Sequence, residues 1–99
     1  MRIIARKALK EFYQRPDCLG AKEPLEAWYY ETKKAEWESW TDIKEQYSSA
    51  SILKGSRVVF NIGGNKYRLV VKINFPAQIV YIRFIGTHKE YDQIDAEVI

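Results

Sequence analysis

The stretch from Arg57 to Tyr91 constrains the fold most, because apolar and polar side chains alternate along it. Successive side chains of a strand point to opposite faces. In the first run, one face carries Tyr67, Leu69, Val71 and Ile73, and the other carries Arg68, Val70 and Lys72. In the next run, the same rule predicts one face with Val80, Ile82 and Phe84, and another with Tyr81, Arg83 and Ile85.

Turn residues separate these runs. Gly63-Gly64-Asn65 lies between two runs rich in β-branched and aromatic residues, and Gly and Asn tolerate the positive φ of a tight hairpin. Pro76 lies in the second break, where it removes no interior ladder hydrogen bond. The pattern predicts three consecutive antiparallel strands, with Arg68, Lys72 and Arg83 on one solvent face and Tyr81 among them.

The basic charge of the chain is concentrated in this region. From Ser51 to Lys89 there are seven Lys or Arg residues and no Asp or Glu, whereas residues 1–50 carry nine of each sign. The seven cations are Lys54, Arg57, Lys66, Arg68, Lys72, Arg83 and Lys89. A block without carboxylates indicates nucleic acid or an acidic protein segment as the partner.

The first half of the chain predicts helices. Met1 to Ala5 is typical of an edge strand that joins the later sheet, and a stripe of apolar residues predicts a helix over Arg6–Gln14. Pro24 suits the first turn of a second helix. Its aromatic stripe is best explained as core packing, with contact to a protein partner as the alternative; it consists of Leu25, Trp28, Tyr29, Thr32 and Ala35.

The middle of the chain is less regular. Asp42 and Glu45 have the spacing of a capping box, which predicts a short helix over Ile43–Tyr47. Residues 48–51 are predicted to form a loop, with Ile52 and Leu53 anchoring it to the core. We therefore expect one α+β domain over residues 1–99, with N-terminal helices packed on one face of a small antiparallel sheet.

The composition excludes several classes of site. Cys18 is the only cysteine and His88 the only histidine, so an internal disulfide or a cysteine-based zinc cluster cannot form and a dedicated metal site is not expected. We expect no cofactor. Charged residues interrupt the N-terminal apolar run, and no stretch approaches the roughly 20 apolar residues of a membrane span, so we expect a cytoplasmic protein without membrane contact.

The basic strands lead to a helix start with acid–base groups. Thr87 is placed to cap a terminal turn in which His88 and Tyr91 are i and i+3 neighbours. Cleavage of an RNA phosphodiester without metal requires removal of the 2′-hydroxyl proton, stabilisation of the phosphorane charge and protonation of the leaving 5′-oxygen. The arginines of the basic strands, together with His88 and Tyr91, are residue types that can perform these three tasks.

Each task has a candidate residue. Arg68 and Arg83 would clamp the phosphate, since a guanidinium binds two phosphate oxygens and stays charged. His88 is the simplest general acid or base. Tyr91 would be a second one if a cation lowered its pKa, and would otherwise stack on a base. Lys72 would add charge or, if its pKa were depressed, act as a base.

Structural explanations compete with these roles. A single histidine beside a helix start is more often a surface or capping residue than a catalyst. Arg68 and Lys72 are also what the exposed face of a half-buried sheet ordinarily carries, and Gly-Gly-Asn is more often a hairpin than a phosphate-binding loop. Only the convergence of these residues with His88 and Tyr91 favours a functional interpretation.

Three segments resemble the HigB group of bacterial toxins within the RelE-like superfamily. They are IIARKALKEF (Ile3 to Phe12), VVFNIGGNKYRLVVKI (Val58 to Ile73) and YIRFIGTHKEYDQID (Tyr81 to Asp95). The resemblance assigns Arg68 and Arg83 to the two strand arginines of the family pattern and His88 and Tyr91 to its T-H-x-E-Y-D element. Asn65 and Lys66 correspond to its G-N-K turn.

The resemblance implies a type II toxin that cleaves mRNA, usually in the ribosomal A site. It also implies silencing by a HigA-like helix-turn-helix antitoxin, through which alone operator DNA would be contacted. The implied fold is α+β, with one sheet face covered by helices and the other left for RNA. Family members divide the acid and base tasks differently, so the assignment between His88 and Tyr91 stays open.

Two other functions fit the same residues. One is a non-catalytic module whose basic sheet binds nucleic acid or an acidic protein segment, since the superfamily includes gyrase-directed members of similar fold. The other is an inhibitor of translation from a phage or mobile element that leaves mRNA intact. The pairing of His88 and Tyr91 with the arginines favours cleavage, because a pure binder would not require it.

Overall fold

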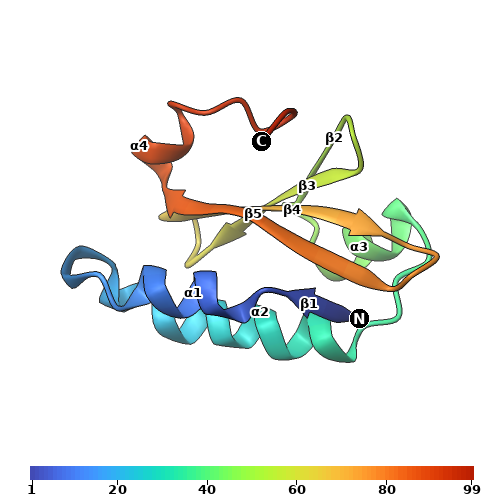
Figure 1. The fold of residues 1–99 in the computed structure, drawn as a ribbon, viewed down its shortest axis with the longest axis horizontal. Coiled ribbons are helices and arrows are strands. Elements are labelled where there is room, and N and C mark those ends of the chain that lie inside the picture. Colours follow the sequence, from blue (N-terminus) through green and yellow to red (C-terminus); the bar gives the residue numbers. More distant parts are fainter.

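The computed structural model describes residues 1–99 (Figure 1). The elements in chain order are β1 (Arg2–Ile4), α1 (Arg6–Tyr13), the 3-10 segment η1 (Pro16–Ala21), α2 (Lys22–Lys34), α3 (Trp40–Gln46), β2 (Ser51–Leu53), β3 (Arg57–Ile62), β4 (Tyr67–Asn74), β5 (Ile79–Thr87) and α4 (His88–Tyr91). The strands form one sheet in the order β1-β5-β4-β3-β2. This arrangement confirms the α+β class.

The centre of the sheet is the predicted antiparallel meander of β3, β4 and β5. Gly63 and Gly64 adopt φ values of 62° and 69° in the first hairpin, a left-handed conformation that glycine adopts without steric cost. At one edge, β1 pairs in parallel with β5, which confirms the predicted N-terminal edge strand. At the other edge lies β2, antiparallel to β3.

Helices α1 and α2 cover one face of this sheet (Figure 1). Their apolar stripes are buried, with Leu9 and Phe12 from α1 and Leu25, Trp28 and Thr32 from α2. They pack on the sheet side chains Phe60, Leu69, Val71 and Val80. The aromatic stripe of α2 is therefore core, as expected. No helix is both long enough and apolar enough to cross a lipid bilayer.

A β-bulge changes the face assignment of β5. Val71 pairs with Ile82 but Val70 pairs with Phe84, so Arg83 is the extra residue between the two pairs. Beyond the bulge the phase reverses: Ile85 packs on the main core and Phe84 on the opposite face. The prediction that Phe84 shares a face with Val80 and Ile82 was wrong, because the extra residue adds one step to the alternation.

The face opposite α1 and α2 is partly covered rather than open. The segment after α4 crosses this face (Figure 1), and Ala96 packs with the buried Val59 and Val70. Partly buried side chains that surround this cluster are Leu53, Phe84, Tyr91, Ile94 and Ile99. The RNA face expected from the resemblance is thus reduced to the β4–β5 side and the turn before β4.

Two predictions for the middle of the chain were wrong in detail. The short helix begins at Trp40 rather than Ile43, because Ser39 is its N-cap and accepts a hydrogen bond from the Asp42 amide. Asp42 instead accepts a hydrogen bond from the Glu38 amide. Residues 51–53 form strand β2 rather than the end of a loop, since they pair with β3.

Candidate active site

The β3–β4 turn and α4 lie together at one end of the sheet. The register pairs Tyr67 with Thr87 and Arg68 with Gly86, which brings the end of β5 beside the start of β4. The main-chain N–H of His88 donates to the carbonyl oxygen of Lys66 at 3.1 Å. We call residues 63–68 and 86–91 the hairpin end of the sheet.

Arg68 is buried at this end, with only 9% of its surface exposed. Its Nη1 donates to the main-chain oxygens of Asn65 at 3.1 Å and of Tyr67 at 3.3 Å, and its Nη2 donates to Asn65 Oδ1 at 2.8 Å. The expectation of a solvent-exposed Arg68 was therefore wrong, because the side chain folds back onto its own hairpin. Nε and the second N–H of Nη2 donate to no protein acceptor.

The predicted cap of α4 is confirmed. Thr87 Oγ1 accepts from the Glu90 amide at 3.2 Å, and Glu90 Oε1 accepts from the Thr87 amide at 3.0 Å, which is a complete capping box. The Thr87 amide, followed by Arg15, lowers the pKa of the Glu90 carboxyl. This cap fixes the turn that carries His88 and Tyr91.

The two acid–base candidates have different surroundings. His88 is exposed, and its Nδ1 lies 3.3 Å from Asp92 Oδ2. That contact leaves Nε2 as the ring nitrogen available to a substrate. Tyr91 is half-buried and packs against the apolar cluster of Val59, Val70 and Ala96. A ring held by packing is suited to fixed stacking or to proton transfer at one position.

Gly86 has a steric role at the hairpin end. A Cβ at this position would lie 2.4 Å from Phe84 Cζ and 3.2 Å from Glu90 Cβ. The Phe84 ring therefore lies against the backbone of Gly86, the residue that pairs with Arg68 on β4. Strand β5 continues through Gly86 to Thr87, which is also the N-cap of α4.

Arg83 belongs to a different part of the sheet from Arg68. Its guanidinium lies 5.7 Å from the ring centroid of Tyr81, and Tyr81 pairs with Lys72 on β4. Gly86, the partner of Arg68, is three residues away from Arg83, roughly 10 Å along a strand. The two arginines thus start from positions offset along the sheet, and Arg83 is exposed on the bulge.

The remaining predicted RNA-binding residues divide between the two ends of the sheet. Lys66 and Lys89 are exposed at the hairpin end, beside His88. Lys54 lies in the turn before β3, at the opposite end. Arg57 also lies there, and its Nε and Nη2 donate to the main-chain oxygen of Ile99 at 2.9 and 2.7 Å. The guanidinium of Arg57 is thus engaged with the C-terminal segment.

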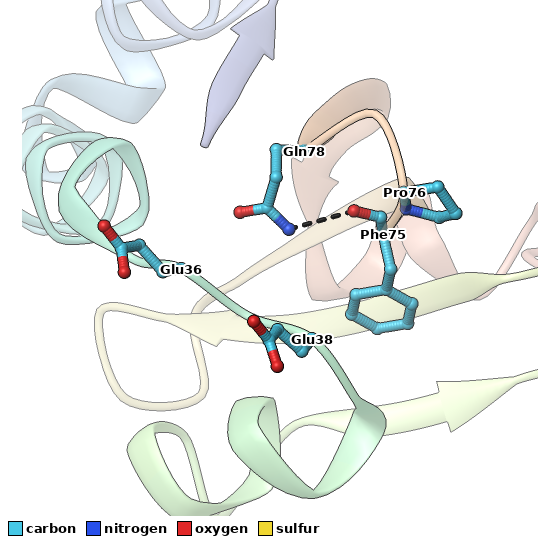
Figure 2. Close-up of a pocket in the computed structure, with 5 residues that line it drawn as sticks. All are labelled: Glu36, Glu38, Phe75, Pro76 and Gln78. Atoms are coloured by element: carbon cyan, nitrogen blue, oxygen red, sulfur yellow. Dashed lines mark hydrogen bonds between the residues drawn. The ribbon is translucent and has the colours of Figure 1, made fainter.

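The largest surface hollow, about 600 Å³, is not at the basic face. Figure 2 shows it between the α2–α3 connection, with Glu36 and Glu38, and the β4–β5 turn, with Phe75, Pro76 and Gln78. Gln78 Nε2 donates to the Phe75 carbonyl oxygen at 2.9 Å. Two carboxylates at its rim would repel a phosphate, which makes this hollow unsuitable for an RNA backbone.

Sequence reasoning missed two residues that contact this region. Glu90 was detectable, because Thr87 and Glu90 have capping-box spacing. Arg15, which forms an ion pair with Glu90, gave no signal, since 75 residues separate the two. No group of three or more His, Cys, Asp or Glu side chains is arranged to hold a metal ion.

Comparison with known proteins covers most of the chain. Residues 21–94 match the model of a family described as HigB toxin, the RelE-like toxic component of a toxin–antitoxin system. This chain belongs to the HigB toxin family. The match includes the whole hairpin end and all of the sheet except β1.

Curated relatives extend the match over nearly the whole chain. The chain is 35% identical to the mRNA interferase toxin HigB of Escherichia coli K12, with 93% of this chain and 88% of the relative covered. The proteins named mRNA interferase HigB from Escherichia coli O157:H7 and Shigella flexneri match with the same identity and coverage. Membership of a toxin family implies an antitoxin as a partner.

Proposed function

We propose that this HigB family member is a metal-independent endoribonuclease that cleaves mRNA at the ribosome during translation. The observation that carries the proposal is the assembly of Arg68, His88 and Tyr91 at the hairpin end, held by the hydrogen bond from His88 N–H to the Lys66 carbonyl oxygen. The names of the curated relatives support mRNA as the substrate. Translated mRNA places the activity in the cytoplasm.

The reaction would proceed by attack of a ribose 2′-hydroxyl on the adjacent phosphorus. One of His88 and Tyr91 removes the hydroxyl proton, and the other protonates the departing 5′-oxygen. The two free N–H donors of Arg68 stabilise the charge on the phosphorane oxygens. Their orientation is fixed in advance by the hydrogen bonds to Asn65, so little reorganisation accompanies the step.

The outlying cations would bind the message away from the cleaved bond. Lys66 and Lys89 flank the hairpin end, and Lys72 and Arg83 extend the positive surface along β4 and β5. Arg83 is thus assigned to RNA binding on the basis of its place beside Tyr81. Lys54 and Arg57 lie at the end of the sheet opposite the hairpin end, so they would contribute only through the long-range electrostatic potential of the protein.

A HigA-like antitoxin would silence the toxin, and operator DNA would be contacted only through it. The competing function is non-catalytic binding, to the ribosome or to gyrase. The observation that favours binding is that His88 contacts Asp92 and Arg68 contacts Asn65. A surface without catalytic activity can make the same contacts. Primer extension on translated message distinguishes catalysis from binding.

The decisive experiment is primer extension on mRNA from a cell-free translation reaction, with ribosomes present, stalled or omitted. We expect discrete cuts on translated message only. Tyr91→Phe removes only a hydroxyl and His88→Gln removes the titratable ring, so each should reduce cutting if its group transfers a proton. Lys7→Met, in the outer helical layer, is the matched control. Intact message with translation blocked would contradict cleavage and establish binding.

A further inference from the structure

An ion pair joins the helical layer to α4 around the end of the sheet. Arg15 follows α1, and its Nη1 lies 3.2 and 3.1 Å from the two carboxylate oxygens of Glu90 in α4. In Figure 1, α1 and α4 lie on opposite sides of the sheet. The pair therefore connects two layers that the β-strands otherwise separate.

Both partners are restrained by further contacts. The Arg15 guanidinium lies 5.1 Å from the ring centroid of Phe12, and its Nη2 bonds Asp17 Oδ2 at 3.3 Å. Glu90 accepts from the Thr87 amide through Oε1. The Phe12 ring fixes the plane of the guanidinium, so Arg15 loses less freedom when it binds Glu90. Asp17 is 64% exposed, and its ion pair with Arg15 contributes little to this restraint.

Helix α4 has few other attachments. It is a single turn of four residues, too short to be stable by itself. Its remaining tethers are the hydrogen bond from His88 N–H to Lys66 O and the packing of Tyr91 on the second apolar cluster. The Arg15–Glu90 pair is the one ion pair between α4 and the helical layer.

We propose that Arg15 and Glu90 are positioning residues, which hold α4 so that His88 and Tyr91 stay in register with Arg68. This inference rests on the proposed function. Neither residue touches RNA in this role: Arg15 acts through Glu90, and Glu90 acts through the turn that it caps. A displacement of about 1 Å in a catalytic group is enough to lower a rate by roughly 100-fold, so a surface ion pair can affect catalysis more than stability.

The kinetic test compares Arg15→Met and Glu90→Gln with Asp17→Asn. Glu90→Gln keeps an oxygen acceptor for the Thr87 amide and removes only the charge. Asp17→Asn alters the other partner of Arg15 and is the matched control. On ribosomes programmed with a defined message, we expect kcat to fall about tenfold in the first two variants, with KM within about twofold of wild type. Asp17→Asn should retain the wild-type kcat.

Two further comparisons separate positioning from general destabilisation. The double variant should be no slower than either single one, because both remove the same interaction. Arg15→Lys, which keeps the charge, should recover part of the lost kcat. A rise in KM at constant kcat would overturn the proposal in favour of RNA binding by Arg15, and equal losses in Asp17→Asn would overturn it in favour of a nonspecific effect.

A readout without activity distinguishes failure of this inference from failure of the proposed function. His88 is the only histidine, so its imidazole resonances report on α4 without assignment ambiguity. In Arg15→Met and Glu90→Gln, we expect these resonances to shift and the amide of Asp92, which donates to the His88 carbonyl oxygen, to exchange faster than in Asp17→Asn. Unchanged spectra and exchange would overturn the positioning role. If wild type cuts no RNA but these changes occur, only the proposed function fails.

Discussion

Arg68 donates to both oxygens of Asn65, the main-chain oxygen at 3.1 Å and Oδ1 at 2.8 Å. The cation is thus held by an uncharged residue of its own hairpin rather than by a carboxylate. Its full positive charge remains available to a ligand, because an amide orients a guanidinium without neutralising it. This relationship makes Asn65 a residue through which the orientation and the charge of Arg68 can be tested separately.

Replacing Asn65 should affect cleavage in two distinguishable ways. Asn65→Ala removes one hydrogen bond to a charged donor, so we expect roughly a three- to tenfold loss of kcat from the disordered guanidinium. Asn65→Asp keeps the acceptor but neutralises the charge, so RNA affinity should fall as well. The measurement is cleavage rate and RNA binding, with Asn74→Ala as control, since Asn74 holds the β4–β5 turn in the same way by accepting from Ala77 N–H. If Asn65→Ala cleaves RNA at the wild-type rate, Asn65 does not orient Arg68 for cleavage.

Gly86→Ala should destabilise the protein by about 1–3 kcal/mol, the usual cost of overpacking. The new Cβ would lie 2.4 Å from Phe84 Cζ, so the ring, which packs against the cluster of Val59, Val70 and Ala96, would have to shift. Thermal melting should show the loss, at roughly 4–8 °C per kcal/mol for a domain of this size. Adding Phe84→Leu to Gly86→Ala should recover part of the lost stability. If the double variant instead loses the sum of the two single losses, a contact other than Phe84 excludes the methyl group.

The salt dependence of RNA binding should identify which cations touch phosphate. For a single strand, the slope of log K against log salt changes by about 0.7 for each phosphate that the protein no longer neutralises. We expect that change for Arg83→Met and Lys72→Met, which lie along the exposed part of β4 and β5. Lys7→Met should leave the slope unchanged, since Lys7 pairs with Glu11 on the outer helical layer. If all three variants show the same slope, neither Arg83 nor Lys72 contacts an RNA phosphate.

The contribution of Glu90 to stability should disappear in acid. The Thr87 amide and Arg15 hold the pKa of this carboxyl below its usual 4.5, so its ionised form favours the folded state. The contribution is full above about pH 4.5 and is lost as the pH falls through the folded-state pKa. Chemical unfolding at a series of pH values should therefore show a wild-type advantage over Glu90→Gln at pH 7 that narrows below 4.5. A constant advantage would mean that the charge does not contribute.

The meander and the helical core were predictable because they follow from local patterns. Alternation from Tyr67 to Ile73 and the Gly63-Gly64 turn fix two strands, and the stripe of α2 fixes its buried face. The bulge gave no such signal: Phe84 and Ile85 are both apolar, so exchanging their faces leaves the polarity pattern unchanged. Sequence alone also could not choose between Ser39 and Asp42 as the cap of α3, because both are good capping residues three positions apart.

The sequence names the residues of the candidate site but does not give their arrangement. Arg68 was assigned to solvent from alternation, which gives the direction of Cβ but not the path of a long side chain that returns to its own turn. The offset between Arg83 and Arg68 along the sheet was not visible either, because the extra residue at the bulge leaves no mark in the sequence. The Arg15–Glu90 contact depends on how the layers close around the sheet, and no local spacing encodes it.

The parallel pairing of β1 with β5 makes the first strand of the chain depend on the last. During synthesis, β1 emerges from the ribosome long before Ile79–Thr87, so this edge of the sheet cannot close until β5 has been made. His88 and Tyr91 emerge later still. A polypeptide released early from a broken message, ending before β5, would lack the partner of β1 and the whole of α4. Such fragments would be incomplete products without the proposed cleavage centre, so damage to the toxin's own message would not add active toxin.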